Sequence, residues 1–240
     1  MSQTAKNLNR TYHQAQSQME YLPNYYKWSY HSFMPYIAGD IIELGAGAGI
    51  GIKQYLEQVN KIYVIDHDEK LLSKLEQNIT SPKIKTVCMD LNESWSKLEN
   101  TQVDNIIMMD VLEHFQDDFS FLKKTLSHLK PNGHVLIKVP HSNKDFCEID
   151  KASGHFRRYD KEHMIKLAKI LNLELLSIKS INPLGLLAYK LKKDQKTNFS
   201  RSFSATQLKI INSLIPVIKQ FDHLNFLPGL SLCAVFKKHK

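Results

Sequence analysis

Glycines at alternate positions follow a short apolar segment near residue 40, and this feature constrains the fold more than any other. The segment 40–44 predicts a buried strand, and Gly45, Gly47 and Gly49 predict a tight turn directly after it. Glycine adopts positive φ in such a turn and lets the backbone come close to a ligand. A glycine cluster after the first strand of an α/β sheet is typical of a site for a nucleotide-like ligand.

Apolar segments continue to alternate with helical patterns beyond this turn. Further strands are predicted at 61–66, 84–89, 105–109, 134–139, 173–180 and 231–237, and helices at 50–59, 69–79, 119–129 and 161–171. A Lys-Pro-Asn-Gly sequence at 130–133 is expected to end the helix that precedes it. Strands and helices that alternate at this spacing form βαβ units, which predicts an α/β protein with a parallel sheet and right-handed crossovers.

Four segments are expected along the chain. Residues 1–38 form an N-terminal polar arm and an aromatic-rich helical cap, 39–181 the core, 182–229 a helical insertion, and 230–240 the final core strand and tail. Within the insertion, 206–221 has apolar residues at three- and four-residue steps, which indicates a helix. The cap and the insertion are expected to act as lids. Peripheral contact of this helix with a membrane surface is an alternative.

Charge is unevenly divided along the chain. The formal net charge is +8, but residues 1–120 carry 10 Lys and Arg against 16 Asp and Glu, whereas 121–240 carry 22 against 8. The basic half predicts a surface that faces an anionic partner. Cys88, Cys147 and Cys233 form no C-x-x-C pair, so a reducing, cytoplasmic location is expected. The polar N-terminus and the short apolar runs predict neither a signal peptide nor a membrane span.

Three acidic residues lie at the ends of the first three predicted strands. Glu43 lies two positions before Gly45, where a carboxylate disfavours a pyrophosphate and favours a cationic amino group. Asp66 can accept hydrogen bonds from both hydroxyls of a ribose, and Asp90 can accept from an exocyclic amine such as that of adenine. An ammonium group, a ribose and an aminopurine, met in this order along the chain, describe S-adenosylmethionine.

The segment Asp110-Val-Leu-Glu-His114 follows the fourth predicted strand and is similar to a V-L-E-H segment common in class I S-adenosylmethionine-dependent methyltransferases. The chain resembles that superfamily over about 20–180 and in its final strand. This resemblance implies a Rossmann-like sheet of seven mostly parallel strands, with helices on both faces and an antiparallel last strand. It also implies which residues surround each part of the cofactor. The methionine part is surrounded by Glu43, Gly45, Ala46, Gly47 and Gly49, and the ribose by Asp66 and His67. The adenine lies beside Asp90 and Leu91, and the sulfonium beside Asp110 and Val111.

The polar segment after the fifth predicted strand is expected to supply the acceptor side of the site, because ligands of such sheets bind at the carboxyl ends of the strands. His155 is the candidate general base, since histidine titrates near neutral pH and can take a proton from the acceptor. Asp150 and Tyr159 are expected to orient His155 or the acceptor. His141 is the second candidate for contact with the substrate, because it lies nearer the end of the strand.

Two adjacent arginines, Arg157 and Arg158, extend this candidate acceptor site. Their forked donors suit a carboxylate or phosphate on the acceptor, and pairing with loop carboxylates such as Asp150 is the structural alternative. The G-H-x-R-R-Y segment at 154–159 and the N-P-L-G segment at 182–185 resemble a type 11/12-like methyltransferase subgroup. That subgroup is often associated with surface-glycan or natural-product pathways.

The predicted function is methyl transfer from S-adenosylmethionine to oxygen or nitrogen of a small-molecule or glycan acceptor that carries an anionic group. An RNA or other nucleic-acid methyltransferase is an alternative, which the lack of an Asn/Asp-Pro-Pro-Tyr/Trp sequence after the fourth strand disfavours. A catalytically silent protein that binds the cofactor is another. No metal is expected, because His13, His31 and His223 have no partners at metal-ligand spacing.

Overall fold

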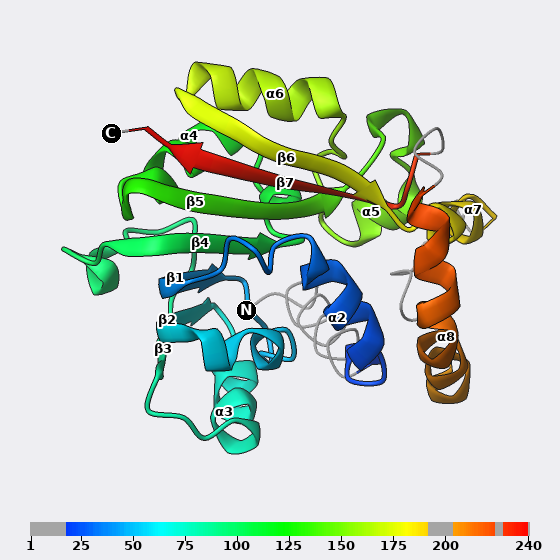
Figure 1. Cartoon of the computed structure of the whole chain (residues 1–240), viewed down its shortest axis with the longest axis horizontal. Coiled ribbons are helices and arrows are strands. Elements are labelled where there is room, and N and C mark those ends of the chain that lie inside the picture. The colour runs from blue at the N-terminus through cyan, green and yellow to red at the C-terminus, as the bar shows by residue number, and fades with distance from the viewer. Residues whose placement is uncertain (1–17, 192–203, 224–227, 240) are drawn as a thin grey trace.

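One mixed sheet organises the residues that the structure, a computed structural model, describes: 18–191, 204–223 and 228–239. The strands are β1 Gly39–Leu44, β2 Val59–Asp66, β3 Ile84–Cys88, β4 Val103–Met109, β5 Leu129–Pro140, β6 Leu173–Ile181 and β7 Ser231–Lys238. They lie in the order β3-β2-β1-β4-β5-β7-β6 (Figure 1). All pairs are parallel except those of β7, which is antiparallel to both of its neighbours. The predicted Rossmann-like fold is confirmed.

Helices cover both faces of the sheet. They are α2 Pro23–His31, α3 Glu69–Asn78, α4 Asp118–Leu126, α5 Glu148–Ala152, α6 Lys161–Ile170, α7 Pro183–Lys190 and α8 Ala205–Ile218. One hydrophobic cluster packs α4 and α6 on one face, and a second packs α2, α3 and α8 on the other. Ile106 and Met108 of β4 join the first cluster, whereas Ile107 joins the second. Because successive side chains of a strand point to opposite faces, a strand buried on both faces is apolar throughout.

The predicted helix at 50–59 is wrong. The segment forms two short 3-10 turns, Ile52–Gln54 and Leu56–Gln58, which are separated by Tyr55 at a φ of −133°. Tyr55 is buried, and its hydroxyl donates a hydrogen bond to Glu43 of β1. This contact holds the Tyr55 backbone outside the helical region, so the local helical pattern is overridden by tertiary structure.

The predicted helix stop at 130–133 lies inside β5. Helix α4 ends earlier, at Leu126, and β5 already pairs at Leu129 with Val103 of β4. The register of this pairing then shifts, and Asn132 adopts a φ of +63°. The proline and glycine of this segment therefore mark an irregularity within a strand, where Pro and Gly are tolerated, and not a connecting loop.

The N-terminal cap and the C-terminal insertion contact each other. Asn24 of α2 donates two hydrogen bonds to Asn212 of α8, at 2.8 and 3.0 Å. The indole nitrogen of Trp28 donates to Asp222 Oδ2 at 2.6 Å. The two covers therefore form one joined layer, and their action as lids stays a prediction. The arm at 1–17 and most of the basic stretch before α8 lie outside the described residues, among which no helix is long and apolar enough to cross a bilayer.

Candidate active site

The turn after β1 is the first element of the candidate site. Gly45, Gly47 and Gly49 have φ values of +65°, +55° and +69°. A Cβ atom on Gly45 would lie 2.7 Å from Val111 Cγ2, and one on Gly49 would lie 2.3 Å from Leu75 Cδ1. Residues with side chains are strained at such φ values and have no room here. The turn therefore requires glycine where it packs between the end of β4 and α3.

Asp66, the last residue of β2, holds this turn in place. Its buried carboxylate accepts hydrogen bonds from the backbone nitrogens of Gly47 at 2.8 Å and Asp68 at 2.9 Å. The backbone nitrogen of Ala46 donates to a β2 carbonyl at 3.2 Å. The His67 imidazole lies 3.4 Å from the Asp66 carboxylate, with 60% of its side chain exposed. The structure thus brings together the glycine turn, Asp66 and His67.

Asp90 and Leu91 follow β3, the strand next to β2. The Asp90 carboxylate accepts hydrogen bonds from the backbone nitrogen of Asn92 at 2.8 Å and from its side-chain amide at 2.9 Å. The backbone hydrogen bond lowers the pKa of Asp90, so the group is ionised at neutral pH. The Leu91 carbonyl accepts from the Trp95 indole at 3.1 Å. Asp90 therefore presents an exposed, charged acceptor beyond Asp66 on the same edge of the sheet.

Glu43 is sealed below the glycine turn instead of being open to a ligand. Its side chain accepts hydrogen bonds from the hydroxyls of Tyr30 and Tyr55, one at each carboxylate oxygen. Burial raises the pKa of Glu43 despite these two bonds, and it also raises the pKa of Tyr30 and Tyr55. The Glu43 carboxylate is therefore not exposed for the predicted direct contact with an ammonium group. No sequence spacing connects the two tyrosines with Glu43, so they were not predicted.

Asp110 lies at the carboxyl end of β4 and pairs with Lys138 of β5. Asp110 adopts a φ of +56°, and the Lys138 side chain is 2% exposed. Lys138 Nζ lies 5.5 Å from the centre of the Tyr25 ring. Burial by itself lowers the pKa of Lys138, but the attraction of Asp110 outweighs it and the pKa is raised. Sequence reasoning missed Lys138, although a single lysine in an apolar strand indicates a buried charge with a partner.

A buried network centred on Asp150 organises the segment after β5. The Asp150 carboxylate accepts hydrogen bonds from Arg158 Nε at 2.9 and 3.0 Å, Tyr189 Oη at 2.6 Å and the Cys147 nitrogen at 3.0 Å. It also lies 3.1 Å from His155 Nδ1. Burial opposes ionisation of Asp150, but the bonds from His155 and Arg158 outweigh it and hold its pKa well below the usual range. The predicted contact of Asp150 with His155 is present, and Arg158 pairs with Asp150 as the structural alternative predicted.

Three other predicted acceptor-site residues are held by partners of their own. Tyr159 is fully buried and donates to Asp118 Oδ2 at 3.0 Å, so it is not placed to orient His155. Arg157 Nη1 lies 2.8 Å from the same carboxylate. His141 Nδ1 lies 2.8 Å from Ser180 Oγ of β6. For Tyr159 and Arg157 the cause is Asp118 in the first turn of α4, a poorly exposed carboxylate that both of them contact.

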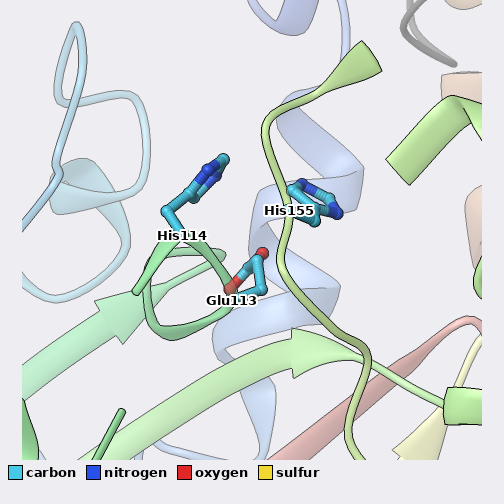
Figure 2. A group of neighbouring side chains, drawn as sticks. All are labelled: Glu113, His114 and His155. Atoms are coloured by element: carbon cyan, nitrogen blue, oxygen red, sulfur yellow. The ribbon is translucent and has the colours of Figure 1, made fainter. Parts of the chain in front are cut away.

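Glu113, His114 and His155 form a compact group beside this network (Figure 2). The Glu113 side chain is fully buried, and neither of its carboxylate oxygens has a hydrogen-bond partner among the described residues. The rings of His114 and His155 meet edge to face, with centroids 4.8 Å apart. Burial raises the pKa of Glu113 and lowers that of His114 to about 4. In the sequence, Glu113 and His114 belong to the V-L-E-H segment, but no spacing or motif indicates that His155 lies beside them.

The sheet order, the glycine turn and the charged residues at the carboxyl ends of the strands define a Rossmann-like methyltransferase fold. Residues 42–137 match the model of a family described as a methyltransferase domain. This match lies within the predicted core and agrees with the resemblance of the sequence to class I S-adenosylmethionine-dependent methyltransferases.

Known proteins similar to this chain are also described as methyltransferases. A protein of Mycobacterium tuberculosis named as a probable S-adenosylmethionine-dependent methyltransferase is 23% identical over 103 residues, which are 43% of this chain and 36% of the relative. The matched part thus spans about a third of the length of such relatives. The solved structure of a SAM dependent methyltransferase from Archaeoglobus fulgidus is 17% identical to this chain in sequence, with a TM-score of 0.59. The match covers 88% of this chain and 92% of the Archaeoglobus chain. The N-methyltransferase NodS from Bradyrhizobium japonicum, solved with S-adenosyl-L-homocysteine, has 15% identity, a TM-score of 0.55, and coverage of 89% and 83%.

Proposed function

We propose that this protein transfers a methyl group from S-adenosylmethionine to an oxygen or nitrogen atom of a small-molecule or glycan acceptor that carries an anionic group. The observation that carries the proposal is the edge of the sheet at which the glycine turn is held by Asp66, with Asp90 on one side and Asp110 on the other. The names of the relatives and the S-adenosylhomocysteine complex of NodS support the choice of cofactor.

The residues at this edge fit the cofactor. The turn has positive φ at Gly45, Gly47 and Gly49, and glycine at such positions lets the backbone come close to a ligand. Asp66 can accept from ribose hydroxyls directly beside the turn, and the exposed Asp90 can accept from an exocyclic amine. When bound, S-adenosylmethionine supplies a methyl group made electrophilic by the sulfonium charge. At the end of β4, where we propose that the sulfonium binds, Asp110 and Lys138 form an ion pair.

His155 is the group that we assign to the proton of the acceptor. The Asp150 carboxylate lies 3.1 Å from its Nδ1, which favours the tautomer with the proton on Nδ1 and the lone pair on Nε2. The His155 side chain is 16% exposed, which gives an acceptor atom access to it. A hydroxyl or ammonium acceptor must lose a proton during methylation, and an imidazole positioned by a carboxylate can take it. Asp150 is therefore a positioning residue. The excess positive charge of residues 121–240 supports an anionic group on the acceptor.

Titration calorimetry with S-adenosylhomocysteine tests the cofactor site. Asp66→Ala should weaken binding more than about tenfold, because removing an acceptor that is charged costs about 1.5–3 kcal/mol. Asp66→Asn keeps the shape and serves as a second variant, and circular dichroism verifies that both fold. Glu99→Ala, at an exposed carboxylate in the β3–β4 connection, is the matched control and should bind as the wild type does. Unchanged affinity in both Asp66 variants would place the ribose elsewhere.

A screen for transferred methyl groups then separates the candidate activities. Glycans, phenols, amines and RNA are offered with labelled S-adenosylmethionine, and the product is identified by mass spectrometry. Methylation of a glycan or another small acceptor agrees with the proposal. Methylation of RNA alone would replace it with the nucleic-acid alternative. Tight binding of S-adenosylhomocysteine without transfer to any acceptor would favour a catalytically silent cofactor-binding protein.

A further inference from the structure

We propose that Glu113, His114 and His155 bind a divalent transition-metal ion. One ligand atom of each of these residues lies within 4.8 Å of the others, and Figure 2 shows the three side chains near one another on two segments of the chain. Metal–ligand bonds of about 2.0–2.2 Å hold ligand atoms up to ~4 Å apart. A modest rotation of one imidazole therefore closes the set around an ion.

The Glu113 carboxylate is the strongest sign of a missing partner. It is fully buried, and both oxygens lack a hydrogen-bond donor among the described residues. A buried polar group without a partner is costly, and an unpaired buried charge is more so. Lys138, a buried cation whose charge acts on Glu113, is already paired with Asp110. A metal ion at this position would compensate the carboxylate and account for its burial.

Both imidazoles are oriented in the way that metal-binding histidines usually are. Nδ1 of His114 lies 3.2 Å from the carbonyl oxygen of Gly154, and Nδ1 of His155 lies 3.1 Å from Asp150 Oδ1. An acceptor at Nδ1 favours the tautomer with the proton there and leaves the lone pair on Nε2. A ligating histidine almost always donates its second ring nitrogen to a carbonyl or carboxylate in this way.

The backbone joins the two segments that carry the cluster. Glu113 and His114 belong to the 3-10 turn Leu112–His114 after β4. The Phe156 nitrogen donates to the Glu113 carbonyl at 2.8 Å, next to the contact between Gly154 and His114. These bonds fix the spacing between residues far apart in the sequence. Preorganisation of this kind favours a binding site because little ordering is left for the ligand to impose.

One carboxylate and two imidazoles select the class of metal. Zn²⁺, Mn²⁺, Fe²⁺ and Co²⁺ accept mixed nitrogen and oxygen ligands, whereas Ca²⁺ and Mg²⁺ prefer oxygen alone. Three protein ligands leave at least one position for water or an acceptor oxygen. In that role, which rests on the proposed function, the ion lowers the pKa of a bound acceptor hydroxyl. With the ion bound, Nε2 of His155 is a metal ligand, and the ion instead of the imidazole promotes loss of the acceptor proton. Without the ion, Nε2 keeps the role of base that the proposed function gives it.

The test measures metal binding directly, without any methylation assay. Full-length protein without an affinity tag is treated with EDTA, dialysed, and titrated with Zn²⁺, Mn²⁺ or Co²⁺ in a calorimeter; bound Co²⁺ is also followed by its visible absorption. We expect one ion per chain, and binding at least about tenfold weaker in Glu113→Gln and His155→Ala, since even outer-shell changes cost about 10–100-fold. His128→Ala is the matched control, because His128 Nδ1 also contacts a carbonyl, at 3.1 Å, but lies outside the cluster.

The outcomes separate this proposal from the proposed function. The absence of saturable binding to the wild type would overturn the metal site and indicate that Glu113 is neutral through protonation. Unchanged affinity in either cluster variant would overturn the ligand set, provided that thermal unfolding without metal shows the variant to be folded. S-adenosylhomocysteine binding is measured on the same EDTA-treated sample. Cofactor binding without metal binding contradicts only the metal site, and metal binding without cofactor binding contradicts only the proposed function.

Discussion

The substitution Asp150→Asn tests how the segment that carries His155 is held. The Asp150 and Arg158 side chains are 1% and 3% exposed, and Arg158 Nε lies 2.9 Å from the carboxylate. Asparagine keeps the shape of the side chain and removes its charge. The guanidinium of Arg158 then stays buried without a counter-charge, and the hydrogen bonds from Tyr189 and Cys147 lose their charged acceptor.

The expected cost follows from this burial. Removing one partner of a buried ion pair destabilises a protein by about 3–5 kcal/mol. Because the amide oxygen still accepts one or two of the hydrogen bonds, we expect the lower end, about 3 kcal/mol. That is a factor of roughly 100–200 in the folding equilibrium constant, at about 1.4 kcal/mol per factor of ten. With an m-value of about 3 kcal/mol per molar urea, the midpoint of unfolding falls by about 1 M.

Urea unfolding followed by far-UV circular dichroism measures this shift. The control is Glu148→Gln on the same helix, α5, where Glu148 and Lys151 form an ion pair with side chains 45% and 60% exposed. An exposed pair contributes about 0–1 kcal/mol, so the control midpoint should barely move. Replacing both buried partners, by Asp150→Leu with Arg158→Met, should recover part of the loss. An Asp150→Asn midpoint equal to that of the control would refute the reasoning.

Three further results are expected. Gly49→Ala should destabilise the fold by about 1–3 kcal/mol and weaken S-adenosylhomocysteine binding, because its Cβ would lie 2.3 Å from Leu75 Cδ1 at a φ of +69°; calorimetry and urea unfolding measure both effects. Burial raises the pKa of Glu43, so the folded protein binds the Glu43 proton more tightly than the unfolded chain does. The resulting contribution to the free energy of unfolding is present at low pH and is lost as the pH rises through the raised pKa. Glu43→Gln should therefore gain stability relative to wild type between pH 4 and pH 8, and a constant difference across that range would contradict the raised pKa. His155→Ala should lower kcat by about 10²–10⁴-fold with S-adenosylhomocysteine affinity retained, and wild-type turnover would exclude His155 from the reaction.

The fold was predictable because its signals are local. The apolar strands buried on both faces, the glycine turn and the final strand can each be recognised within a few residues. The segment 50–59 failed for the opposite reason, since the hydrogen bond from Tyr55 to Glu43 depends on the packed structure and overrides the helical pattern. The start of β5 was misplaced because proline and glycine at 131–133 indicate a break equally well in a loop and in an irregular strand.

The candidate site divides in the same way. Asp66 could be placed beside the glycine turn because the carboxyl ends of neighbouring parallel strands share one edge of the sheet. The acceptor side depends on which carboxylate each donor of one polar segment reaches, and sequence spacing does not decide that. Asp118, which no motif in the sequence marks, holds Tyr159, and Glu113 lies beside His155 across a long separation in the chain.

The position of β7 has a consequence for how the protein is made. β7 lies between β5 and β6 in the sheet, although it is synthesised after both (Figure 1). β6 pairs with β7 alone among the described strands, so it cannot join the sheet until 231–238 has left the ribosome. Before that moment the nascent chain can form the five strands from β3 to β5, with the backbone groups of β5 unpaired along an apolar edge. Such an edge invites pairing with other chains, so the partly synthesised chain is prone to aggregation until β7 inserts between β5 and β6.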